Sequence, residues 1–152
     1  MNPGTQDHQN PGTHSFQPKI LAFLCNWCSY AGADLAGVSR IQYPPNVRVI
    51  RVPCSGRVNP QFILTALQKG IDGVLVSGCH PGDCHYISGN YIARRRAVII
   101  NNLLEHIGLE KGRVHFAWCS AAEGAKFASI VKEVTEAVKK IGPNRKFKKE
   151  EL

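Results

Sequence analysis

The sequence predicts an α/β domain in which helices cover both faces of a four-stranded parallel sheet. A short apolar segment followed by a longer helical stretch occurs four times between residues 19 and 142. Residues that cap helices stand at the boundaries of these stretches. Because right-handed crossovers join strands that alternate with helices, the strands of such a sheet run parallel.

The apolar segments predict strands at Ile20–Leu24, Val47–Val52, Gly73–Ser77 and Val114–Trp118. The first and third are apolar throughout, as in central strands that are covered on both faces. The second contains Arg48 and Arg51 and the fourth contains His115, which favours edge positions for both. The predicted strand order is therefore 2-1-3-4, that of a shortened flavodoxin-like sheet.

The helical stretches predict helices at about Ala31–Arg40, Pro60–Lys69, Tyr91–Ile107 and Ala121–Ile141. Asn59 before Pro60 is typical of an N-cap followed by proline in the first turn. Ser120 and Glu123 stand at the spacing of a capping box. Three glycines follow helical stretches, where a positive φ can end a helix: Gly70, Gly108 and Gly142.

Size and composition indicate one folded domain with two polar ends. The chain has 152 residues, of which 43% are hydrophobic and 20% charged, as in ordinary globular proteins. We expect a flexible N-terminal arm over residues 1–17, a folded domain over residues 18–142 and a charged tail over residues 143–152. No apolar run approaches the roughly 20 residues that span a bilayer, and the polar N-terminus lacks a signal-peptide core. We therefore expect a cytoplasmic protein that does not enter a membrane.

The net charge of +8 arises from 19 Lys and Arg residues against 11 Asp and Glu residues. Such an excess attracts phosphates and is compatible with nucleic-acid binding. However, basic and aromatic residues are not interleaved, and no nucleic-acid motif occurs. We expect no nucleic-acid partner, and we interpret the excess as solvated surface or as a surface for an acidic partner.

The six cysteines are the most informative residues, because in a reducing compartment they indicate metal binding or redox chemistry rather than disulfides. Cys25 ends the first predicted strand, while Cys54 and Cys79 lie just beyond the second and third. Cys28 and Cys84 lie in loops that leave the same edge of the sheet, in C-N-W-C and C-H-P-G-D-C. Ligands of open α/β sheets bind outside this carboxyl edge. We therefore expect these five thiols to share one site.

Cys119 ends the fourth predicted strand and has no other cysteine in its loop. Free cysteine is often buried and behaves as a small hydrophobic residue. We expect this role for Cys119.

Three kinds of chemistry fit the five thiols. A structural zinc ion accepts C-x2-C spacing, but zinc usually stabilises chains too small to build a core. Cys25 and Cys28 suit the dithiol of a thiol–disulfide oxidoreductase, which leaves the other three cysteines without a role. An iron–sulfur cluster uses four thiolates, and C-x4-C combined with C-x2-C resembles the spacing of plant-type two-iron proteins. We favour an electron-carrying iron–sulfur protein and keep the dithiol and the zinc adaptor as alternatives.

Five segments between Ile20 and about Glu123 resemble one known family. In chain order they read C-N-W-C-S-Y, A-D-L-A-G-V-S-R-I-Q-Y-P-P-N-V-R, P-C-S-G-R-V, G-C-H-P-G-D-C-H-Y-x-S-G-N-Y and S-A-A-E. They are similar to the delta (iron–sulfur) subunit of methyl-viologen-reducing hydrogenase, found in methanogens and some other anaerobes.

The resemblance implies one [2Fe-2S] cluster in a subunit without substrate chemistry of its own, within a hetero-oligomeric complex. It also implies electron transfer from a hydrogenase, or in some complexes a formate dehydrogenase, to the flavin subunit of an electron-bifurcating heterodisulfide reductase. The family's cysteines match Cys25, Cys28, Cys54, Cys79 and Cys84, which are five candidates for four ligand positions. We expect Cys28 to be the spare, and a set that omits Cys54 is the alternative.

His80 and His85 adjoin cysteines, as the histidine ligands of a Rieske centre would. Neighbouring residues usually project in different directions, so Cys79 and His80 are poor co-ligands. We expect the histidines to support the site through hydrogen bonds instead.

Overall fold

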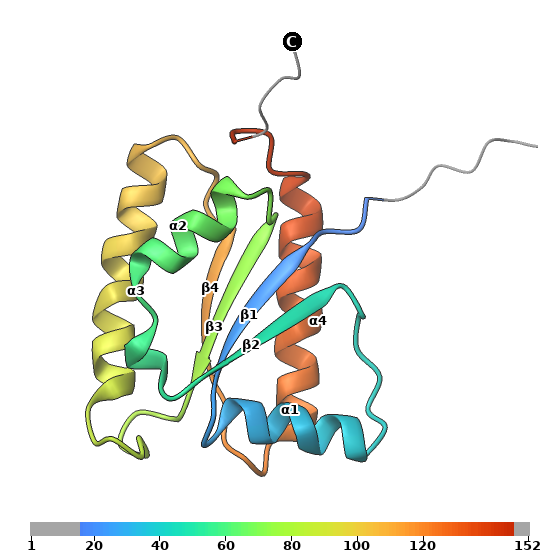
Figure 1. Cartoon of the computed structure of the whole chain (residues 1–152). Helices are drawn as coiled ribbons and strands as arrows, with labels where there is room; N and C mark the ends of the chain where they lie inside the picture. Colours follow the sequence, from blue (N-terminus) through green and yellow to red (C-terminus); the bar gives the residue numbers. More distant parts are fainter. Residues whose placement is uncertain (1–15, 148–152) are drawn as a thin grey trace, which may run out of the picture.

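The computed structural model describes residues 16–147 and confirms the predicted alternation of strands and helices (Figure 1). The strands are β1 (Ile20–Cys25), β2 (Val47–Val52), β3 (Gly73–Gly78) and β4 (Val114–Trp118). The helices are α1 (Ser29–Val38), α2 (Pro60–Gln68), α3 (Gly89–His106) and α4 (Gly124–Ile141). A 3-10 turn that the sequence did not predict, η1 (Ser55–Arg57), lies between β2 and α2.

The strands pair in parallel in the order β2-β1-β3-β4, which confirms the predicted order 2-1-3-4. Every residue of β3 is buried, and Leu21 is the one residue of β1 that is not fully buried. Most residues of β2 are exposed, and β4 is largely half-buried. The charged and polar residues in the two outer strands therefore identified the edges correctly.

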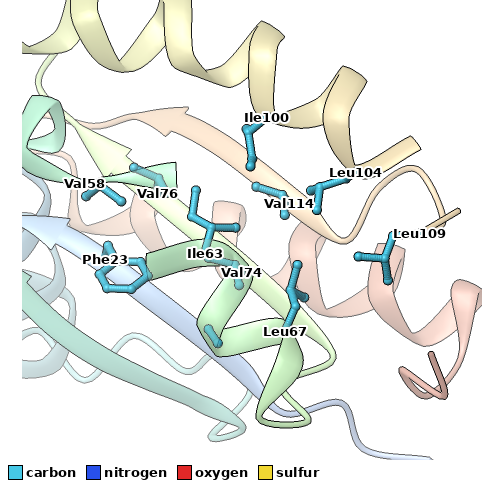
Figure 2. Close-up of a cluster of buried hydrophobic side chains, with 11 residues drawn as sticks. Phe23, Val58, Ile63, Leu67, Val74, Val76, Ile100, Leu104, Leu109 and Val114 are labelled. Carbon is cyan, nitrogen blue, oxygen red and sulfur yellow. The ribbon is translucent and has the colours of Figure 1, made fainter. Parts of the chain in front are cut away.

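Two hydrophobic cores lie on opposite faces of the sheet (Figure 1). Helices α2 and α3 cover one face, and Figure 2 shows their side chains against Phe23, Val74 and Val76. Helices α1 and α4 cover the other face, where Phe127 packs in the core with Ala22. Adjacent residues of β1 serve different cores because successive side chains of a strand point to opposite faces.

The helix boundaries follow the predicted capping residues with local shifts. The Asn59 side-chain oxygen accepts a hydrogen bond from the Gln61 N–H at 2.9 Å at the start of α2. Helix α3 begins at Gly89 instead of Tyr91. Helix α4 begins at Gly124 instead of Ala121, because Glu123 bends back to accept the Ser120 N–H at 2.8 Å and holds the preceding residues in a turn. Three glycines have positive φ values at or just after helix ends: Gly70, Gly108 and Gly142.

The chain enters and leaves the domain at the amino edge of the sheet. The two carboxylate oxygens of Asp72 accept backbone N–H groups of Lys19 and Asn144, each at 2.8 Å. Arg113 is only 1% exposed and donates to the carbonyl groups of Asp72 and Gly142, both at 3.0 Å. One buried polar network thus fixes both ends of the domain.

The expected C-terminal tail is partly packed on the domain. Asn144 is buried, and Phe147 packs against the core beneath α2 and α3. The remaining tail residues and residues 1–15 of the expected arm lie outside the described part of the chain, so the flexibility of both segments stays a prediction.

Candidate metal centre

The five cysteines of the predicted site lie around the carboxyl edge of the sheet, in two groups. Sulfur atoms of the thiol triad, formed by Cys25, Cys28 and Cys79, lie within 4.8 Å of one another. The thiol pair consists of Cys54 and Cys84, whose sulfur atoms are 3.7 Å apart. Strand direction explains this gathering, because β1 and β3 end at the triad while β2 leads into Cys54.

The thiol triad is the more buried group. Cys25 and Cys79 are 1% and 3% exposed, and their sulfur atoms are 3.5 Å apart. Burial raises the pKa of Cys79 and also that of Cys28. These two thiols are therefore protonated near neutral pH unless a bound cation displaces their protons.

The thiol pair lies at the amino end of α3 and differs electrostatically from the triad. Burial raises the pKa of Cys54. Burial also acts to raise the pKa of Cys84, but hydrogen bonds from the backbone of Tyr86, Asn90 and Gly89 outweigh it and lower that pKa. The N-terminus of a helix stabilises negative charge, so Cys84 is the thiol best prepared to act as a thiolate.

Two glycines allow this close approach of backbone and sulfur. A Cβ at Gly89 would overlap the Cys54 sulfur and would lie 3.2 Å from the Cys84 sulfur. A Cβ at Gly56 would lie 2.6 Å from the Gly89 carbonyl oxygen. Glycine at both positions therefore lets η1 pack directly on the start of α3 and leaves space around the thiol pair.

Polar side chains that the sequence analysis did not single out support the triad. Ser29 at the start of α1 and Ser77 in β3 form a buried hydrogen bond of 2.9 Å, which ties the segment after Cys28 to the sheet. The Asn90 amide donates to the carbonyl groups of Cys79 and His80 at 3.2 and 2.6 Å. An amide in the first turn of a helix that follows a cysteine loop was the available sequence signal for Asn90.

The Asn90 side-chain oxygen is buried and has no hydrogen-bond partner among residues 16–147. Buried polar atoms are rarely left without a partner in native proteins. This oxygen therefore marks an unsatisfied acceptor close to the thiols.

The two histidines next to the cysteines do not join the cysteine groups. His80 Nε2 lies 2.6 Å from Glu123 Oε2, and the Ser120 N–H and His80 hold the pKa of Glu123 down to about 2. His85 stacks on Trp27 with 3.7 Å between ring centroids. Both arrangements agree with supporting rather than ligating roles.

Cys119 lies apart from the two groups and has the expected structural role. It is fully buried in the core between the sheet and the helices α1 and α4. Its thiol donates to the carbonyl group of Ser120 at 3.4 Å, and burial raises its pKa to about 11.

Within residues 16–147, no helix combines the length and the apolarity that a membrane span requires.

Comparison with known proteins identifies relatives of this chain. The family model of the methyl-viologen-reducing hydrogenase delta subunit matches residues 20–142. The chain is 52% identical over 129 residues to the iron-sulfur subunit of the F420-non-reducing hydrogenase vhc of Methanococcus voltae, covering 85% of this chain and 90% of that protein. It is 50% identical over 131 residues to the F420-non-reducing hydrogenase iron-sulfur subunit of Archaeoglobus profundus, covering 86% and 96% of the two chains.

A third relative has a different overall length. It belongs to the Ferredoxin/F(420)H(2)-dependent CoB-CoM heterodisulfide reductase of Methanosarcina acetivorans, and one subunit of that reductase is 53% identical over 134 residues. The match covers 88% of this chain but 17% of the reductase subunit. On the family match and these relatives, the chain belongs to the methyl-viologen-reducing hydrogenase delta subunit family of iron–sulfur subunits.

Proposed function

We propose that this protein is a cytoplasmic electron-transfer subunit that binds one [2Fe-2S] cluster. It relays electrons from a hydrogenase or a formate dehydrogenase to the flavin subunit of an electron-bifurcating heterodisulfide reductase. The single observation that carries the proposal is the gathering of five thiols in two groups at the carboxyl edge of the sheet.

Two close sulfur pairs suit a cluster with two thiolates on each iron. Cys25 and Cys79 are 3.5 Å apart, and Cys54 and Cys84 are 3.7 Å apart. In this assignment Cys28 is the spare cysteine beside the buried pair. The alternative set without Cys54 would leave Cys84 without its nearest sulfur neighbour, so the structure favours the first set.

The surroundings of the thiols fit an anionic cluster. When bound, such a cluster accepts and releases one electron at a time. The N–H groups at the start of α3 would donate to the sulfur of Cys84 and stabilise negative charge there. Gly89 keeps side-chain atoms away from the thiol pair, and burial of Cys25 and Cys79 excludes water from the other pair. These residues need no rearrangement to serve both redox states.

The proposed partners follow from the relatives. Two relatives are hydrogenase iron–sulfur subunits, and a third is a heterodisulfide reductase chain that contains a segment similar to this protein. A domain that is a separate subunit in some proteins and part of the reductase chain in another is expected to work beside that chain. We infer that this subunit joins a hetero-oligomeric complex with proteins of both kinds.

A dithiol oxidoreductase based on Cys25 and Cys28 has less support from the geometry. The attacking sulfur of such an enzyme is an exposed thiolate with a low pKa. Cys25 is almost completely buried, and burial raises the pKa of Cys28.

Metal analysis and spectroscopy of anaerobically purified protein test the cofactor. We expect about two irons and two acid-labile sulfides per chain and the EPR signal of a reduced [2Fe-2S] centre. Stoichiometric zinc would identify a structural adaptor, and metal-free protein with a titratable Cys25–Cys28 dithiol would identify the oxidoreductase. A four-iron signal would contradict the proposed cluster type.

A serine series tests the ligand set. Serine at Cys25, Cys54, Cys79 or Cys84 should remove or strongly perturb the cluster absorption, because a hydroxyl group replaces a thiolate ligand. Cys28→Ser is the matched control, since it changes a thiol beside the same site and should leave the spectrum nearly unchanged. Loss of the cluster in this variant, with normal loading in Cys54→Ser, would exchange the roles of the two residues.

A further inference from the structure

The outer edge of β2 has backbone hydrogen-bonding groups without a neighbouring strand. Among residues 16–147, β2 pairs with β1 alone. The carbonyl groups of Asn46 and Val52 accept N–H groups of Ile20 and Asn26 from the β1 side. Because residues of a parallel strand alternate between its two neighbours, Val47, Val49 and Arg51 direct their backbone N–H and C=O groups outward. This edge has the geometry required for one more strand.

The side chains flanking this edge form an apolar surface on both faces of the sheet. Val49 and Ile50 are adjacent, point to opposite faces, and are 44% and 43% exposed. On the α2 side, Ile50 and the 49% exposed Phe62 line a hollow of about 380 Å³ together with Phe23. Edge strands of soluble proteins are usually shielded from such exposure. Here the exposed apolar side chains favour a bound partner.

The same region is uniformly basic. Residues 35–71, which include β2, η1 and α2, contain no Asp or Glu but five basic residues: Arg40, Arg48, Arg51, Arg57 and Lys69. None of the five forms an ion pair with another residue of the described range 16–147. Arg48 and Arg51 lie in the edge strand itself, and Lys69 lines the hollow beside Phe62.

We propose that the outer edge of β2 binds an extended acidic segment of a partner subunit, which adds a fifth strand to the sheet. The backbone of the segment would pair with Val47, Val49 and Arg51. Its apolar side chains would cover Val49 and Ile50, and its carboxylates would face Arg48 and Arg51. Strand addition of this kind takes its affinity from main-chain hydrogen bonds and its specificity from flanking side chains. Acidic residues complement the charge of the edge.

This surface is separate from the thiols and serves anchoring rather than electron transfer. The five cysteines lie around the carboxyl ends of the strands, whereas the β2 edge extends along the length of the sheet (Figure 1). The choice of partner rests on the proposed function, but cluster binding does not depend on this edge. Iron content of the free chain therefore tests the proposed function independently.

Substitution of Val49 tests strand addition directly. Val49→Pro removes one outward N–H but no hydrogen bond to β1, and proline is tolerated on edge strands. The matched control, Val49→Ala, shortens the same side chain and keeps the N–H. We expect Val49→Pro to weaken the complex with co-expressed reductase and hydrogenase subunits by about tenfold or more, and Val49→Ala to weaken it far less. Circular dichroism and iron content establish that each variant is folded and loaded.

Charge reversal and amide exchange complete the test. Arg48→Glu combined with Arg51→Glu should weaken the complex by about tenfold or more, whereas reversal of the exposed Arg94 and Arg95 on α3 should not. Amide protons of Val47, Val49 and Arg51 should become protected from exchange in the complex. Full affinity of the β2 variants, equal loss in the α3 control, or unprotected amides would overturn the proposal. A dimer of the free chain that Val49→Pro abolishes would also overturn it, because a second copy would then occupy the edge.

Discussion

Gly89 illustrates how one residue determines what the thiol pair can bind. It is the first residue of α3, and it has no side-chain atom where a Cβ would meet the sulfur atoms of Cys54 and Cys84. The backbone near this position also lowers the pKa of Cys84. Glycine thus combines close packing with an electrostatic effect on the nearest candidate ligand.

Gly89→Ala should reduce iron content severely without unfolding the domain. The added methyl group would push Cys54 out of place, whereas alanine is well tolerated in a helix. The control is Gly37→Ala in α1, where the added Cβ would meet nothing within 4 Å. That variant should keep full iron content and unfold with a free energy equal to or up to about 1 kcal/mol above that of the parent protein. Full loading of Gly89→Ala would show that the thiol pair does not bind the cofactor.

At this scale the sequence predicted which cysteines gather but not how they group. Strand ends and loops were enough to bring Cys25, Cys54 and Cys79 to one edge, because parallel strands share a direction. The separation into a triad and a pair depends on side-chain directions in irregular loops, which sequence spacing does not encode. The roles of Asn90, Ser29 and Ser77 depend on partners distant in sequence, and they became visible in the structure alone.

The elements were more predictable than the segments between them. Edge and central strands followed from the distribution of charged residues, and Asn59 marked the start of α2 correctly. The turn η1 and the late start of α4 were missed because local hydrogen bonds, such as that from the Ser120 N–H to Glu123, decide these short segments. Hydrophobic periodicity does not report such bonds.

Arg113 connects the start of β4 to the end of α4, and its substitution tests how much this connection stabilises the fold. Arg113→Met would leave the buried carbonyl groups of Asp72 and Gly142 without donors. We expect the free energy of unfolding to fall by about 3 kcal/mol, measured by chemical denaturation followed by circular dichroism.

Lys111→Met provides the control for Arg113→Met. Lys111 forms an exposed ion pair with Glu105 at 2.9 Å, and such pairs contribute at most about 1 kcal/mol. Equal stability of the two variants would show that the buried network at the amino edge does not stabilise the domain.

For the whole molecule, the structure separates three regions with different tasks. The thiols occupy the carboxyl edge, the basic β2 edge lies along one side, and the buried network of Asp72 and Arg113 closes the amino edge. The sequence predicted the first region from cysteine positions. It did not reveal the other two, because they depend on backbone direction and on contacts between residues far apart in the chain.

The shared carboxylate of Asp72 has a consequence for the connectivity of the domain. Since it binds the backbone of both Lys19 and Asn144, the two ends of the fold lie within reach of a short covalent linker. A circular permutant with these ends joined and new termini opened between Glu110 and Gly112 should fold and bind iron like the parent protein, because folds with adjacent ends tolerate permutation. Loss of iron from a folded permutant would contradict this. The order in which the chain visits its strands would then be separable from the site that those strands build.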